Sequence, residues 1–255
     1  MRWCGGEAGE YGNYCIVSGD LLLLWQFRCD ALFMTIYHGS QNIIEQPQFG
    51  VGNPRNDYGL GFYCTRDIGL AKEWACQKNA DGFANEYRVD LSGLSLLDLS
   101  NDSYTILHWL CILMQNRLFY PKTPLGKRNL DVLLQDYRLE YGEYDVIYGY
   151  RANDSYFTFA SDFLENAIPI QSLASSMKLG ELGMQVVLKS ERAFDRLSFV
   201  DAHRADKAEF FSKYKQRDTL ARKSYLDGLR QVEIDDAVYI VDILRKPELL
   251  YGLEL

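Results

Sequence analysis

TIYHGS (residues 35–40) and NDYGLGFYCT (residues 56–65) are the two stretches of this chain that decide its fold. Each is a short apolar run, typical of a buried strand, and each carries one polar aromatic residue, His38 in the first and Tyr63 in the second. Glycines lie beside both, where a ligand can approach the main chain closely. An imidazole can hydrogen-bond a sugar hydroxyl, and a phenol ring can stack on a flat heterocycle. We therefore predict two neighbouring strands that hold a binding site.

Outward from these stretches, the hydrophobic pattern alternates between helices and strands. Residues 41–59, with two prolines and several glycines, predict a loop, and Asp67 is a suitable N-cap for a helix over residues 66–79. A further helix is expected over residues 102–115, broken by the prolines of residues 121–130. The other expected elements are strands at 85–90, 144–150, 183–190 and 197–202, helices at 154–166 and 206–229, a helix or turn at 191–197, and either a strand or a helix at 236–246.

The length and composition permit one substantial hydrophobic core. The chain has 255 residues, of which 47% are hydrophobic and 24% charged, and it shows no internal repeat or flexible linker. Its net charge of −8 and pI near 5.0 argue against a broad electrostatic surface for nucleic acid and leave open a local basic groove. No apolar run approaches the roughly 20 residues of a membrane-spanning helix. We therefore expect a soluble, cytoplasmic protein with no membrane partner.

The six cysteines do not form the framework of a metal site or of a disulfide scaffold. They are scattered, with no C-x-x-C pair and no histidine at metal-ligand spacing, so we expect neither a zinc site nor another metal. A chain of this length without a secretion signal is typical of reduced cytosolic thiols. The six are Cys4, Cys15, Cys29, Cys64, Cys76 and Cys111.

Residues 1–33 differ from the rest of the chain. They are rich in Gly and Cys, lack periodicity and contain LLLLWQF (residues 21–27), which is too short for a transmembrane helix. We hypothesise that Met34 is the native start and that residues 1–33 are an extension added by an over-long gene prediction; the alternative is a genuine leader. Residues 34–255 would then form a single domain, with a C-terminal helical segment from about residue 205.

Five motifs in a fixed order carry a resemblance to known proteins. IYHG followed by G-x-G-F-Y-x-T resembles the His-Tyr branch of the ADP-ribosyltransferase superfamily, which includes the poly(ADP-ribose) polymerases and diphtheria toxin. More closely, the chain resembles a bacterial family, domain of unknown function 3990 (DUF3990), which is assigned to this superfamily and often occurs in toxin–antitoxin-like gene pairs. The motifs, between residues 37 and 244, are YHGS, NDYGLGFYCT, A-x-x-W-A, YDVIYGYRAND and MQVVLKSERAFDRLSF.

This resemblance implies a fold, an activity and partners. The implied fold is α+β, with a split, mostly antiparallel sheet and flanking helices. The implied activity is displacement of nicotinamide from NAD and transfer of ADP-ribose to an unidentified protein or nucleic-acid acceptor, with a small antitoxin protein as a partner. Two alternatives are a non-catalytic module that binds NAD, ADP-ribose or a protein, and an NAD glycohydrolase that uses water as the acceptor.

The resemblance also implies roles for residues of the two opening motifs. His38 would hold a ribose of NAD, and Tyr63 would stack on the nicotinamide. Ser40 would hydrogen-bond the ribose or the carboxamide. Asn56 and Asp57 would line the NAD cleft, although Asn-Asp before Gly is also ordinary turn chemistry. The glycines that would admit the cofactor are Gly39, Gly59 and Gly61.

The third catalytic residue of the superfamily is commonly a glutamate on a late strand, but Gln185 occupies the matching position here. Glutamine can hydrogen-bond a ribose hydroxyl, yet it has no charge to stabilise a developing cation. Asp154, with Asn153 beside it, follows a buried strand and could face the cleft, or it could be a helix N-cap. Glu86 is a second replacement for the missing carboxylate, but it comes early in the order of the motifs.

Other polar residues have ordinary structural explanations. His108 lies in an apolar stretch and is expected to be packed, and His203 is expected at the surface. Arg217, Arg222 and Tyr225 on the terminal helix could reach a pyrophosphate, because arginine binds phosphate through two parallel hydrogen bonds. A solvated or core-bracing helix face is the commoner arrangement for such a cluster.

Overall fold

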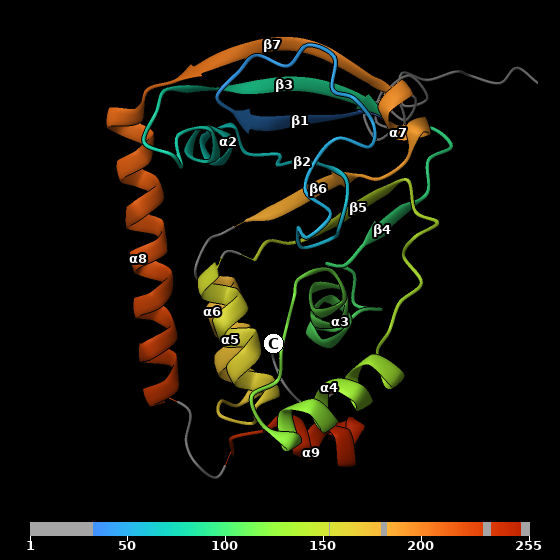
Figure 1. Cartoon of the computed structure of the whole chain (residues 1–255), viewed down its shortest axis with the longest axis vertical. Helices are drawn as coiled ribbons and strands as arrows, with labels where there is room; N and C mark the ends of the chain where they lie inside the picture. Colours follow the sequence, from blue (N-terminus) through green and yellow to red (C-terminus); the bar gives the residue numbers. More distant parts are fainter. Residues whose placement is uncertain (1–32, 153, 180–182, 232–235, 251–255) are drawn as a thin grey trace, which may run out of the picture.

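The computed structural model describes residues 33–152, 154–179, 183–231 and 236–250. Within these ranges the strands form two open sheets, one above the other in the view of Figure 1. The upper sheet is antiparallel, in the order β1 (Phe33–Ser40), β3 (Gly82–Asp90) and β7 (Leu197–Ala205). The lower sheet has the order β2 (Phe62–Cys64), β6 (Met184–Leu188), β5 (Val146–Tyr150) and β4 (Leu96–Asp98). A single antiparallel bridge between Tyr37 and Thr65 links β1 to the end of β2.

The α+β class is confirmed at the level of two open sheets, one antiparallel and one mixed. The lower sheet is mixed because β4 runs parallel to β5, whereas the pairs β5–β6 and β2–β6 are antiparallel. Parallel neighbours need a long crossover connection. Here the crossover contains α3 (Ile106–Asn116) and α4 (Pro124–Asp136), which places these helices below the lower sheet (Figure 1).

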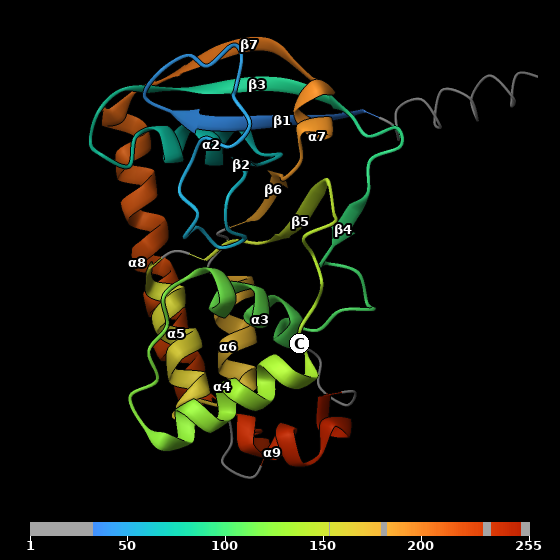
Figure 2. The ribbon, with the colours of Figure 1, turned by 45° about the vertical axis from the view of Figure 1, so that its right-hand side comes forward.

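Apolar side chains pack on both faces of the lower sheet. Between the two sheets lie Ile36 of β1, Tyr87 of β3 and Val186 of β6, all fully buried. Val187 points to the opposite face of β6, because side chains alternate along a strand, and it packs in the larger core formed with the helices. Figure 2 shows α3, α5 (Asp154–Leu164) and α6 (Ile170–Leu179) gathered beneath this sheet. Residue 185 therefore shares the helix-facing side of β6 with Val187.

Local signals account for where several helices begin. α2 (Ile68–Ala75) starts after Asp67, whose side chain accepts a hydrogen bond from Leu70 N at 3.1 Å, which confirms the expected N-cap. The segment expected as a helix or turn contains α7 (Glu191–Asp195). The segment expected as either a strand or a helix contains α9 (Ile240–Arg245), and the short 3-10 helix η2 (Pro247–Leu250) follows it.

The expectation for residues 121–130 is incomplete, because α3 already ends at Asn116 and α4 begins within this segment. Thr123 is the N-cap of α4, and its side chain accepts a hydrogen bond from Gly126 N at 2.9 Å. Pro124 occupies the first turn, where its missing N–H costs nothing because that position has no helical partner. β4 and α6 also had no predicted counterpart.

The long helix α8 (Lys207–Gln231) runs along one side of the molecule, past α2 and α6 (Figure 1). Arg217 fastens it to α2 through the buried carboxylate of Glu73, with Nε at 2.8 Å and Nη2 at 2.9 Å from the two oxygens. Among the described helices, none is long and apolar enough to cross a bilayer. Cys64, Cys76 and Cys111 are free, buried thiols.

Candidate functional site

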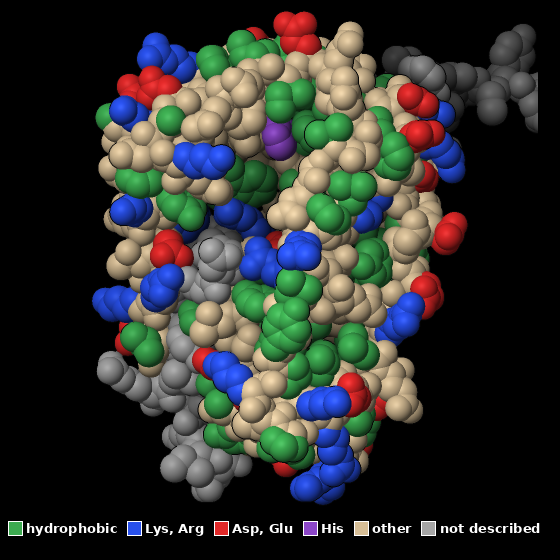
Figure 3. Space-filling view, viewed as in Figure 1, with side chains coloured by type: hydrophobic (Ala, Val, Ile, Leu, Met, Phe, Trp, Pro, Cys, Tyr) green, Lys and Arg blue, Asp and Glu red, His purple; other side chains and the backbone are tan. Residues whose placement is uncertain are grey.

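A cavity of about 480 Å³ opens where β1, β2, β6, α2 and α8 meet. In the view of Figure 3, a histidine is visible in the upper part of the molecule, and several Lys or Arg side chains lie below it, near the middle. The walls of the cavity come from motifs that lie far apart in the sequence. The residues that the sequence singled out and that line it are His38, Gly39, Asn56, Asp57, Tyr63, Gln185 and Arg222.

His38 is held in one orientation by two contacts. Its ring stacks on Phe62, with centroids 4.4 Å apart and planes inclined by 26°. Its Nδ1 lies 2.7 Å from the main-chain oxygen of Tyr63. Because a carbonyl only accepts hydrogen bonds, Nδ1 carries the proton, and in the neutral ring Nε2 is an acceptor. Burial lowers the pKa of His38, which favours this neutral form and suits Nε2 to accept from a ligand hydroxyl.

Tyr63 and Lys189 fix the loop that precedes β2. The Tyr63 hydroxyl donates to the main-chain oxygen of Gly59 at 2.6 Å and accepts from Tyr58 N at 3.0 Å. Lys189 Nζ donates to the main-chain oxygens of Tyr58 and Leu60, at 2.5 and 2.6 Å. Burial lowers the pKa of Lys189. The ring of Tyr63 lines the cavity while its hydroxyl is engaged with the loop, so the ring is the part left to meet a ligand.

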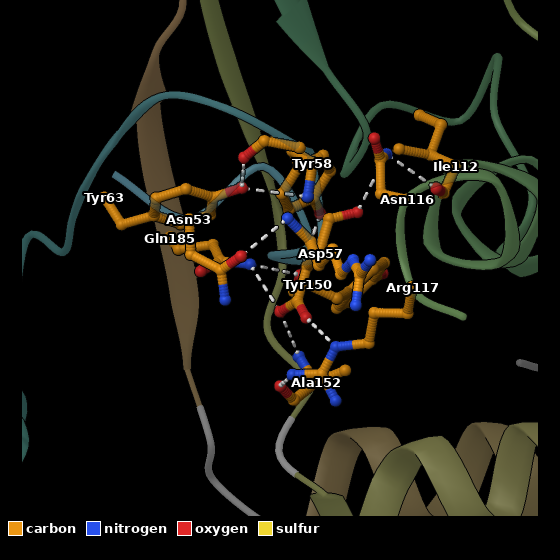
Figure 4. A network of polar contacts seen from close by, with 12 residues as sticks. Asn53, Asp57, Tyr58, Tyr63, Ile112, Asn116, Arg117, Tyr150, Ala152 and Gln185 are labelled. Carbon is orange, nitrogen blue, oxygen red and sulfur yellow. Dashed lines mark hydrogen bonds and ion pairs between the residues drawn. The ribbon is translucent and has the colours of Figure 1, made fainter. Parts of the chain in front are cut away.

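Asp57, directly before that loop, is a buried carboxylate in the cavity wall. Its Oδ2 accepts from Ala152 N at 2.8 Å and from Gln185 Nε2 at 3.0 Å (Figure 4). Its Oδ1 forms an ion pair with Arg117 Nε at 2.9 Å. Burial raises the pKa of Asp57, and Arg117 and the two hydrogen bonds oppose this effect. The carboxylate is thus held by two hydrogen bonds and one ion pair, from three separate segments.

Gln185, near the start of β6, is directed toward Asp57. Its Nε2 donates to Asp57 Oδ2 and also approaches the main-chain oxygen of Tyr150, at 3.2 Å. Only 3% of Gln185 is exposed, yet it contributes to the cavity wall. The position where the resemblance implies a glutamate therefore holds an amide whose immediate neighbour is a carboxylate.

Three arginines add positive charge to the cavity: Arg117, Arg151 and Arg222. The guanidinium of Arg151 lies 4.6 Å from the ring centroid of Trp74. In the described part of the chain it has no ion pair or hydrogen bond with a side chain, and burial lowers its pKa. Arg222 on α8 pairs with Asp218 at 3.1 Å. Arg117 is committed to Asp57, so Arg151 is the cation best placed to bind an anionic ligand.

Three other residues expected to contact the cofactor do not line this cavity. The Ser40 hydroxyl donates to Asn42 O at 2.5 Å and accepts from Asn85 Nδ2 at 3.1 Å, so it organises the start of the loop after β1. A Cβ on Gly59 or Gly61 would lie 2.6 Å from a neighbouring side chain, and Gly59 also has a φ of 74°. Packing therefore favours glycine at both positions, and the main-chain conformation also favours it at Gly59.

The two candidates for a replacement carboxylate are not part of the described cavity wall. Asn153 lies outside the described residues, and Asp154 begins α5 with a side chain that also lies outside them. Glu86 Oε2 lies 2.6 Å from His203 Nε2 on the neighbouring strand of the upper sheet. His108 accepts a hydrogen bond from Thr105 N at 2.9 Å, so it caps α3.

The three residues singled out on the terminal helix, Arg217, Arg222 and Tyr225, do not share one role. Arg217 braces α8 against α2, and Arg222 lines the cavity, whereas the side chain of Tyr225 lies outside the described part. Several wall residues were not anticipated. Arg117 and Arg151 follow the end of a helix and of a strand, and no local pattern distinguishes them from surface arginines. The others are Trp74, Gln77, Ala152, Tyr214 and Asp218.

The described ranges contain no group of three or more His, Cys, Asp or Glu side chains arranged to hold a metal ion.

A family model described as "Protein of unknown function (DUF3990)" matches residues 34–199. No curated protein and no solved structure matches the chain. Since the matched residues make up more than half of its length, the chain belongs to the DUF3990 family.

Proposed function

We propose that this DUF3990 protein is an NAD-dependent ADP-ribosyltransferase that acts on a protein or nucleic-acid acceptor. One observation carries the proposal: His38 and Tyr63, from two separate motifs, line one cavity with Gln185 from a third. These are the three positions that the resemblance assigns to the catalytic site. The proposal includes an ADP-ribosyltransferase-like fold and a cytoplasmic location.

The dimensions and polarity of the cavity support NAD as the ligand. Its volume of about 480 Å³ lies within the usual range for small-molecule sites. NAD carries a pyrophosphate, and Arg151 supplies a guanidinium without a carboxylate partner among the described residues. His38 Nε2 can accept a hydrogen bond from a ribose hydroxyl, and the Tyr63 ring can stack on nicotinamide.

The reaction breaks the bond between ribosyl C1 and the nicotinamide nitrogen. The electron pair of that bond leaves with nicotinamide, which becomes neutral, and C1 acquires positive charge. An acceptor oxygen or nitrogen then forms a bond to C1 and loses its proton to water. The site contributes chiefly by holding the ribose and by stabilising the charge on C1.

A single experiment separates this activity from the two alternatives. The full chain is incubated with adenine-labelled NAD, with and without cell lysate, and both free nicotinamide and label on macromolecules are measured. We expect nicotinamide release that depends on lysate, together with label that protease or nuclease removes. Release with water alone would identify a glycohydrolase, and NAD binding without release would identify a non-catalytic module, the reading that the uncharged Gln185 favours.

A small antitoxin remains the proposed protein partner. This partner is supported by the resemblance to a family that often occurs in toxin–antitoxin-like gene pairs. Co-purification of the tagged chain with the product of the neighbouring small gene tests this part independently of the enzymatic activity. Recovery of the chain alone would contradict the proposed antitoxin partner.

A further inference from the structure

The negative charge that Gln185 lacks is present at its hydrogen-bond partner. Gln185 Nε2 lies 3.0 Å from Asp57 Oδ2, and both residues line the cavity. The sequence suggested only a cleft-lining or turn role for Asp57. Because the two side chains touch, a carboxylate and an amide occupy the region where the superfamily places one glutamate. The inference below rests on the proposed function of the site.

Asp57 retains capacity to interact with a ligand. An ionised carboxylate has about four acceptor sites. Two hydrogen bonds reach Oδ2, from Ala152 N and Gln185 Nε2, whereas Oδ1 is ion-paired with Arg117 and accepts no hydrogen bond among the described residues. Oδ1 is buried, so what Asp57 offers a ligand is the negative charge of a carboxylate in the cavity wall, which acts on a charge at ribosyl C1 without a hydrogen bond.

The carboxylate is also fixed before a ligand arrives. Arg117 Nη2 donates to the main-chain oxygen of Ala152 at 3.1 Å, so the cation that pairs with Asp57 is itself anchored. Asn116 Nδ2 lies 3.3 Å from the main-chain oxygen of Asp57. Preorganised charge of this kind stabilises a transition state without reorganisation during the reaction.

We propose that Asp57 is the catalytic carboxylate of this site, taking the electrostatic role of the absent glutamate while Gln185 orients it. As the bond from ribosyl C1 to nicotinamide breaks, the negative charge of Asp57 stabilises the positive charge that develops on C1. Asp57 forms no covalent bond in this step, and the acceptor proton goes to water. Gln185 is in this scheme a positioning residue.

A cycle of three variants tests the proposal: Asp57→Asn, Gln185→Glu and the double variant that carries both. The double variant exchanges the carboxylate and the amide, so the net charge of the pair and the number of carboxylates stay the same. Gln185→Glu alone places two carboxylates against each other, which is unfavourable. For each variant, kcat and KM for nicotinamide release from NAD are measured, together with the midpoint of thermal unfolding.

We expect Asp57→Asn to lower kcat roughly 100-fold with little change in KM, because charge on the transition state is lost while NAD binding persists. The exchange variant should have a kcat at least about tenfold higher than that of Asp57→Asn, although Gln185→Glu alone also lowers kcat. Such recovery requires that the charge, rather than the shape of Asp57, matters. A merely structural carboxylate would change unfolding and KM without this pattern in kcat.

Asp145→Asn is the matched control. Asp145 is as buried as Asp57, with exposures of 4% and 5%, but it bonds Ser190 and Ser95 outside the cavity. Its replacement should leave kcat unchanged. Wild-type kcat in Asp57→Asn, or no recovery in the exchange variant, would overturn the assignment of Asp57. If the wild-type chain releases no nicotinamide under any condition, the proposed function itself fails.

Discussion

At the scale of single residues, Tyr63 illustrates how one side chain can serve both the fold and the ligand. Its hydroxyl holds the loop through Gly59 and Tyr58, and its ring lines the cavity. Removing the hydroxyl and removing the ring should therefore have separable effects.

We expect Tyr63→Phe to lower the free energy of unfolding by about 2 kcal/mol, since two hydrogen bonds to the loop are lost, and to change NAD affinity only slightly. Tyr63→Ala should lower it by about 3 kcal/mol or more and should also abolish most NAD binding. Urea denaturation and calorimetry measure the two quantities. Tyr120→Phe, at a position that is 75% exposed, is the control. Wild-type NAD affinity in Tyr63→Ala would show that the ring does not stack on the ligand.

Arg151 belongs to the same scale, because its guanidinium lies over the ring of Trp74 and has no ion-pair partner in the described part of the chain. We expect Arg151→Gln to weaken binding of ADP-ribose roughly tenfold, the size of one charge-assisted hydrogen bond, and to leave adenosine binding unchanged. Adenosine lacks the pyrophosphate. Calorimetry with both ligands makes the comparison, and Arg204→Gln at an exposed ion pair with Asp81 is the control. Equal losses for both ligands would argue against a pyrophosphate contact.

At the scale of elements, α2 connects the upper sheet to α8. Gly39 of β1 lies so close to α2 that a Cβ would be 2.1 Å from Ala71 O, and Arg217 of α8 binds Glu73 on α2. The family match ends at residue 199, before α8, yet Tyr214 and Asp218 of α8 line the cavity. The clamp between Arg217 and Glu73 therefore helps to complete the cavity wall.

We expect Arg217→Gln to lower the free energy of unfolding by about 3 kcal/mol, because the buried carboxylate of Glu73 loses its guanidinium. NAD affinity should fall with it, since the wall formed by α8 is released. Lys213→Gln removes an exposed ion pair with Glu209 on the same helix and should cost less than about 0.5 kcal/mol. Chemical denaturation and NAD titration of both variants test this. Similar stability of the two variants would exclude Arg217 as a clamp.

The elements were predictable where the signal is local. Asp67 caps α2 within three residues, and β6 is visible in the sequence as the apolar run MQVVL. Pro124 was expected only to break a helix, but it lies in the first turn of α4, where a proline is tolerated. β4 has three residues, too few to show a period. The pairing of β4 with β5 depends on contacts across the intervening helices, which no local pattern records.

At the scale of the whole molecule, the net charge of −8 gives no indication of where charge collects. The cavity wall contains three arginines and two aspartates, so a site with local positive charge exists within an acidic chain. The sequence could predict His38, Tyr63 and Gln185 from their motifs. It could not predict the partnership of Asp57 with Arg117, because residues 60 positions apart meet only after α3 has packed below the lower sheet.

Stability against pH is also a property of the whole molecule, and two histidines govern it near neutrality. Burial lowers the pKa of His38 and of His108 below the ordinary value of 6.5. The unfolded chain therefore binds more protons than the folded chain between the folded pKa values and about pH 6.5. The contribution of these residues to stability is complete above that range, and it is lost as the pH falls through it.

We accordingly expect the free energy of unfolding to be lower at about pH 5.5 than at about pH 7.5. His38→Gln and His108→Gln should each reduce this difference, and the double variant should remove most of it, because glutamine does not titrate. Urea denaturation at both pH values provides the measurement. As the pH is lowered, NAD affinity should decrease in wild type and in His108→Gln, since protonation turns Nε2 of His38 from an acceptor into a donor. An unchanged pH dependence of unfolding in the double variant would show that other groups govern it, whereas loss of the NAD effect in His108→Gln would place the ligand-linked proton at His108.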